Sequence, residues 1–229
     1  MANVKSTKKE EVRTETVEQV SSVEKFYNTY KKCIWGTVIA ILAIGCAFLA
    51  YNKWVYGPAC AEAQGQMYPA EQLFAQSNYE TALNGDGNIL GFAQIIDEYG
   101  AKAGKAVYMY AGVCELQLGN YEEALGYLRK YNGNDPVLAP RAKACEGDAL
   151  VGLGEAHYAE AVKCYETAAS MKDNVFAANY LFKAGTVYEA MGNVAKALEC
   201  YETVKEKYPQ SVEAADIVKH IAGVKAVEE

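Results

Sequence analysis

Polar and apolar residues along the chain follow the spacing of helices. Residues 212–227, for example, place Ile217, Ile221 and Val224 on one stripe of a helix. Alanine, leucine, glutamate and lysine are plentiful and proline is scarce, while β-branched residues do not gather in alternating runs. The pattern therefore predicts an all-α protein.

One segment, Cys33 to Tyr51, is apolar throughout and has no charge in nineteen positions. A helix of about 20 apolar residues spans the hydrocarbon core of a bilayer. Aromatic residues flank both ends, including Tyr30 before the segment and Trp54 after it, as in interfacial belts. The segment therefore predicts a single transmembrane helix that contacts membrane lipid.

Basic residues flank this helix unequally. Arg13, Lys25, Lys31 and Lys32 precede it, whereas Lys53 alone follows closely. The positive-inside rule then places the N-terminus in the cytoplasm and the remaining chain outside it. The alternative is a signal peptide cleaved near Ala59-Cys60-Ala61. The 32 residues before the apolar run and the length of that run favour an uncleaved anchor.

Small residues recur at regular distances through residues 105–211. Three glycines lie 35 and 38 residues apart, and three alanines lie 37 and 36 residues apart. These periods surround the ~34 residues of a tetratricopeptide repeat (TPR), a pair of antiparallel helices. The repeat-defining residues are Gly112, Gly119 and Ala124 in the first clear unit, Gly147, Gly154, Ala161 and Tyr165 in the second, and Gly185, Tyr188, Gly192, Ala197, Tyr201 and Pro209 in the third.

These patterns divide the chain into seven segments. The segments after the transmembrane helix are predicted to form an α-solenoid of about nine helices. The segments are a cytoplasmic tail (1–32), a transmembrane helix with its interfacial flank (33–56), degenerate first TPR-like helices (57–104), a TPR (105–138), a TPR with a lengthened turn (139–177), a TPR (178–211) and a C-terminal capping helix (212–229).

The charge and the motifs of the chain give little support to catalysis, metal binding or nucleic-acid binding. Residues 57–229 have fourteen basic and twenty-four acidic side chains, and an acidic domain repels phosphate backbones. No motif for a catalytic triad, a zinc protease or a phosphate loop is present. His157 and His220 are interpreted as surface residues, and Asn84–Asn88, which has one Asp, as a loop and not a calcium site. We predict no catalytic, cofactor or metal site.

The seven cysteines match no zinc spacing. Cys164 and Cys200 occupy equivalent places in two repeats, which favours small apolar core residues. A disulfide among the five cysteines beyond the membrane segment stays open.

A stack of helix pairs presents a concave surface, and the first helix of each pair lines it. Apolar and charged side chains on these helices suit protein contacts. The predicted partner-binding groove comprises Met109, Tyr110, Val113, Arg141, Asp148, Asn179, Phe182 and Lys183. Whether it takes a helix or an extended segment stays open.

A cytoplasmic tail ending in Val23–Tyr27 and Lys31-Lys32, one apolar helix and then tetratricopeptide units resemble the YfgM-like family of bacterial membrane-anchored proteins. The resemblance is strongest over residues 84–112 and 179–185. It implies a place in the inner membrane, with the repeats in the periplasm. It also implies protein partners, namely SecYEG translocon subunits, periplasmic chaperones of the PpiD type or client proteins, and an ancillary role in protein export or envelope-protein folding.

The main alternative is a structural adaptor in an outer-membrane assembly or secretion machine, and homo-oligomerisation stays open. A hydrolase is disfavoured because no constellation of reactive side chains supports it.

Overall fold

The computed structural model describes residues 2–171 and 175–228, with side chains for 26–171 and 176–226. Within these residues every regular element is helical and no strand occurs, which confirms the all-α prediction. The chain divides into two compact units, residues 1–58 and 59–229.

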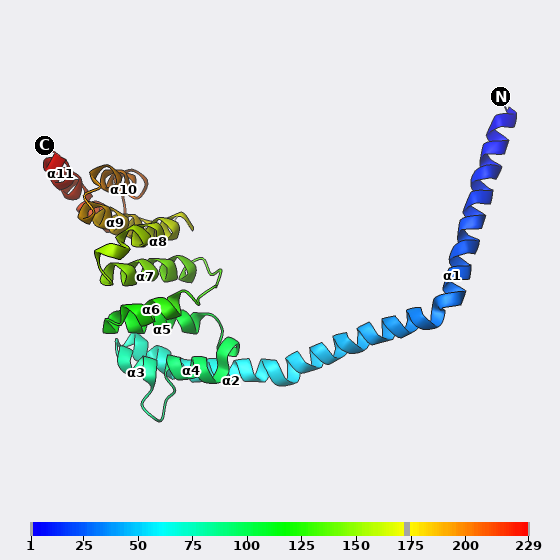
Figure 1. The fold of residues 1–229 in the computed structure, drawn as a ribbon, viewed down its shortest axis with the longest axis horizontal. Helices are drawn as coiled ribbons and strands as arrows, with labels where there is room; N and C mark the ends of the chain where they lie inside the picture. Colours follow the sequence, from blue (N-terminus) through cyan, green and yellow to red (C-terminus); the bar gives the residue numbers. More distant parts are fainter. Residues whose placement is uncertain (1, 172–174, 229) are drawn as a thin grey trace. The chain divides into compact units, whose positions relative to one another are not determined.

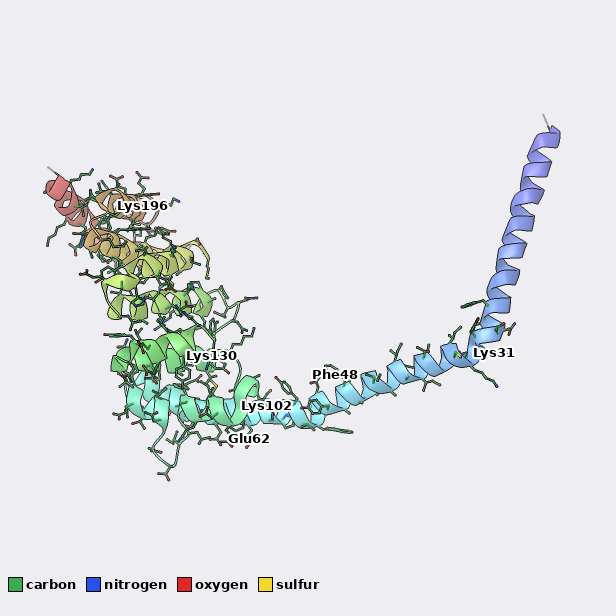
Figure 2. The ribbon with its side chains drawn as sticks, viewed as in Figure 1. Lys31, Phe48, Glu62, Lys102, Lys130 and Lys196 are labelled. Carbon is green, nitrogen blue, oxygen red and sulfur yellow. The ribbon has the colours of Figure 1, made fainter. Side chains whose placement is uncertain are left out.

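The first unit is dominated by α1 (Ala2–Tyr51), which is followed by a π-helical turn at Asn52–Tyr56 (Figure 1). Large apolar side chains such as Ile44, Phe48 and Leu49 are exposed along α1, and Phe48 is labelled in Figure 2. The helix from Phe26 onward is long and apolar enough to cross a membrane, and its apolar part is not buried in the protein.

The second unit is a row of helices that follow one another in chain order (Figure 1). Its helices are α2 (Gly57–Ala75), α3 (Tyr79–Asn84), α4 (Phe92–Tyr99), α5 (Ala106–Leu118), α6 (Tyr121–Leu128), α7 (Leu138–Gly152), α8 (Tyr158–Met171), α9 (Val175–Ala190), α10 (Val194–Lys207) and α11 (Ile217–Glu228). Short 3₁₀ turns lie at Gly100–Ala103, Glu155–His157 and Glu213–Ala215. The unit thus has ten described α-helices, α2–α11, compared with the about nine that the repeat pattern predicts.

The helix pairs α5–α6, α7–α8 and α9–α10 correspond to the three predicted repeats, although α9 begins three residues before the expected boundary at 178. Contacts run mainly between helices adjacent in sequence, with additional contacts between α3 and α5 and between α5 and α7. This is the nearest-neighbour packing of a solenoid. The segment boundaries given above stay a prediction.

The same type of turn connects the two helices of the first pair and the two helices of the third pair. Gly119 and Gly192 have φ of 83° and 71°, a left-handed conformation that a side chain disfavours. In each turn the next residue donates its N–H to a carbonyl five residues back, from Asn120 to Glu115 and from Asn193 to Tyr188. These are the hydrogen bonds of a Schellman motif, in which a left-handed glycine follows the end of the helix.

Close contact within each pair depends on a glycine of the first helix. A Cβ added to Gly112 would lie 2.6 Å from Leu128 Cγ. One added to Gly147 would lie 2.7 Å from the Tyr165 ring, and one added to Gly185 would lie 2.4 Å from the Tyr201 ring. The second-helix alanines Ala124, Ala161 and Ala197 are fully buried. These three glycines therefore lie at the close contact between the two helices of each pair.

Candidate protein-binding groove

A groove of about 380 Å³ runs across the first helices of the three pairs, α5, α7 and α9. Each helix contributes residues three or four positions apart, which is the spacing of one helix face. The lining residues are Val113, Leu116, Gln117, Val137, Arg141, Ala144, Cys145, Asp148, Phe176, Asn179, Tyr180 and Lys183. Its volume falls at the lower end of the roughly 300–1,000 Å³ typical of ligand pockets.

Five of the eight predicted groove residues line this space. They are Val113, Arg141, Asp148, Asn179 and Lys183. The structure therefore brings together residues from three repeats, 70 positions apart in the chain.

The other three predicted residues lie in aromatic or apolar packing. Met109 is 3% exposed and belongs to the core. The Tyr110 ring stacks on Phe92 with centroids 5.2 Å apart. Phe182 packs edge-on against His220 of α11 at 4.9 Å. The first helix of each pair also packs against the second helix of that pair and against the neighbouring pair. Only one narrow stripe of its surface therefore faces the groove, and these three side chains lie outside that stripe.

Sequence reasoning missed Leu116, Gln117, Val137, Ala144, Cys145, Phe176 and Tyr180. The signal that would have found most of them is the helical stripe itself. Starting from Arg141, positions three, four and seven residues later are Ala144, Cys145 and Asp148.

A hydrogen-bonded network fixes one side of the groove. Lys183 Nζ donates to both carboxylate oxygens of Asp148, at 2.7 and 2.8 Å. The Tyr165 hydroxyl of α8 also donates to Asp148 Oδ1, at 2.8 Å. Burial, together with the Asp148 carboxylate, raises the pKa of Tyr165 well above its usual range, so this hydroxyl stays a donor. One carboxylate thus joins α7, α8 and α9.

The floor of the groove is apolar and chemically inert. Cys145 is 8% exposed, and burial raises the pKa of its thiol to about 11. A thiol with that pKa is neutral at physiological pH and is a poor nucleophile. Cys145 therefore contributes apolar surface beside Ala144 and Tyr180.

Arg141 and Asn179 lie at the polar rim. Asn179 donates to Glu213 Oε1 at 2.9 Å, which attaches α9 to the turn before α11. Arg141 is exposed, and its side chain makes no hydrogen bond or ion pair within the part of the chain whose side chains are described. Of the two cations that line the groove, Lys183 is paired with Asp148, and Arg141 has no ion pair with a described side chain.

Other candidate chemistry has structural explanations in the described residues. Asp86 Oδ1 accepts hydrogen bonds from the N–H groups of Asn88 and Ile89, which close the loop and lower the pKa of Asp86. No group of three or more His, Cys, Asp or Glu side chains is placed to hold a metal ion among the residues described. His157 is exposed in the turn before α8. Cys114, Cys145, Cys164 and Cys200 are free, buried thiols.

Comparison with known proteins agrees with this architecture. Residues 92–139 and 180–211 each match the tetratricopeptide repeat family. The crystal structure of MamA protein is similar, at 17% identity and a TM-score of 0.56, over 74% of this chain and 84% of that chain. At this identity the likeness shows the fold alone. No curated protein matches the sequence. The chain therefore contains tetratricopeptide repeats arranged as an all-α solenoid.

Proposed function

We propose that this protein is a membrane-anchored scaffold that binds other proteins in the groove of α5, α7 and α9. The observation that carries the proposal is the groove itself, a recess with an apolar floor and a charged rim across three repeats. Tetratricopeptide solenoids characteristically use such surfaces for protein binding. Catalysis has no comparable support, because the sequence has no motif for a catalytic triad, a zinc protease or a phosphate loop.

The anchor in this proposal is the apolar helix of the first unit. Its exposed side chains, such as Ile44 and Leu49, suit a lipid environment. The basic residues before it favour a cytoplasmic N-terminus, which would place the repeats on the other side of a bacterial inner membrane, in the periplasm.

The resemblance to the YfgM-like family supports a role beside the SecYEG translocon, with periplasmic chaperones or exported clients as partners. A membrane tether raises the local concentration of the repeats around such partners, so that weak groove contacts suffice for binding.

In-cell photocrosslinking tests this proposal. A photoreactive amino acid would replace Phe176 or Val137, which line the groove with 60% and 54% exposed side chains. The matched control is Val212, which is 87% exposed and does not line the groove. We expect adducts with translocon subunits or chaperones from both groove positions and not from Val212.

Two results would redirect or end the proposal. Adducts with outer-membrane or secretion-machine components would favour the structural adaptor. If the two groove positions yield no more adducts than Val212, the groove is not a binding surface.

A further inference from the structure

The charge in the groove differs from the charge of the domain around it. Residues 57–229 have fourteen basic and twenty-four acidic side chains, a net charge of −10. The charged lining residues are Arg141, Lys183 and Asp148, which together give +1. Because Lys183 is paired with Asp148 at 2.7 Å, the excess positive charge resides on Arg141.

The surroundings of Arg141 are apolar. Val137 lies four residues before it on the same helical face, and Ala144 and Cys145 lie three and four residues after it. Phe176 and Tyr180 of α9 line the same space. A guanidinium beside an apolar recess complements a partner that carries a carboxylate beside a large apolar side chain.

We propose that the groove binds a short protein segment in which a large apolar side chain neighbours an Asp or Glu, with its carboxylate on Arg141. This inference rests on the proposed function and adds the chemistry of the partner. A groove of about 380 Å³ holds a few side chains and not a folded domain.

A side-chain carboxylate fits better than a chain terminus. Terminal carboxylates are typically captured by clusters of free backbone N–H groups. Most lining residues lie inside α5, α7 and α9, where the backbone N–H groups are already bonded within the helix. Among the described lining residues, the Arg141 guanidinium is therefore the charged donor that the groove offers.

The test uses the full-length protein in lipid nanodiscs and a phage library of random 12-residue peptides. The peptides are joined to the coat protein through their C-termini, so a free terminal carboxylate is absent. We expect the selected peptides to contain Phe, Leu, Trp or Met within a few residues of Asp or Glu. Selected sequences would then be synthesised with acetylated and amidated ends, and their affinities measured by fluorescence anisotropy.

Two substitutions separate a specific contact from a general loss of structure. Replacing the peptide acid by its amide should weaken binding to the wild-type protein about tenfold. With Arg141→Gln, both peptides should bind equally weakly. Arg129→Gln is the control, because Arg129 pairs with Glu160 and does not line this groove. Asp148→Asn, which removes the charge opposing Lys183, should tighten acidic-peptide binding by about threefold.

Several outcomes would overturn the inference. They are an absence of enriched peptides, enrichment without acids, binding that requires a free terminal carboxylate, or an unchanged acid preference in Arg141→Gln. If these results occur while crosslinks from Phe176 and Val137 persist, the partner chemistry is wrong and the scaffold function stands. Loss of those crosslinks would instead remove the function itself.

Discussion

At the scale of single residues, the fold depends on small side chains placed opposite large ones. Gly147 and Gly185 lie under the rings of Tyr165 and Tyr201, and both tyrosines are at most 2% exposed. Neither ring can move without disturbing the packed interior. The repeat pattern predicted these glycines because a short contact between paired helices requires the absence of a Cβ.

The substitution Gly185→Ala tests this contact. Its Cβ would lie 2.4 Å from Tyr201 Cε1, so the buried ring must shift. We expect the free energy of unfolding to fall by about 1–3 kcal/mol, as in overpacked cores. Thermal unfolding followed by circular dichroism in detergent measures the change.

Gly126→Ala is the matched control for that experiment. Gly126 lies inside α6, is exposed, and has open space where a Cβ would lie. Alanine favours a helix over glycine by up to about 1 kcal/mol, so this variant should be at least as stable as the wild type. Equal effects of the two alanines would show that the Tyr201 contact does not matter.

At the scale of helices, side-chain hydrogen bonds connect neighbouring helices, both within a pair and between pairs. Asp148 of α7 accepts hydrogen bonds from Tyr165 of α8 and Lys183 of α9. The same arrangement of a tyrosine hydroxyl on a carboxylate occurs from Tyr188 to Glu166 at 2.7 Å and from Tyr201 to Glu189 at 3.0 Å. Each bond joins two helices that are adjacent in the chain.

Replacing Tyr165 by Phe removes one of these bonds and keeps the ring over Gly147. We expect a loss of about 1 kcal/mol in the free energy of unfolding, because Asp148 retains Lys183. Chemical denaturation of the wild type and the variant provides the measurement. Tyr158→Phe is the control, since the Tyr158 hydroxyl makes no hydrogen bond in the described residues, and it should change stability by less than about 0.5 kcal/mol. A Tyr165→Phe protein as stable as this control would contradict the structural role of the network.

The sequence predicts helix pairs better than it predicts the groove. Periodicity and turn glycines such as Gly119 and Gly192 depend on local spacing, which a single sequence contains. The exposure of Met109, Tyr110 and Phe182 depends on which neighbouring pair covers each face. Phe182, for example, meets His220, a residue 38 positions later in a helix beyond the repeats. Such long-range contacts follow from how the pairs stack and not from the pattern of one helix.

At the scale of the whole molecule, the proposed function depends on the side of the membrane on which the repeats lie. Four basic residues lie within about 20 positions before the apolar helix, and only Lys53 follows it closely. We therefore predict that proteinase K added to intact spheroplasts digests the repeats and leaves a protected fragment containing residues 1–32. An epitope at the N-terminus, detected by immunoblotting, identifies that fragment.

A second epitope at the C-terminus distinguishes the competing topologies. A cytoplasmic repeat domain would keep this C-terminal epitope until the spheroplasts are lysed, whereas its N-terminal epitope would be lost to the protease. Cleavage near Ala61 would release the repeats into the soluble fraction without the apolar helix. A further variant, in which Arg13, Lys25, Lys31 and Lys32 become Glu or Gln, removes the charge asymmetry and should increase the population whose repeat domain resists the protease. Because tethering raises the local concentration of the groove around membrane partners, an inverted or released domain should also lose the crosslinks from Phe176.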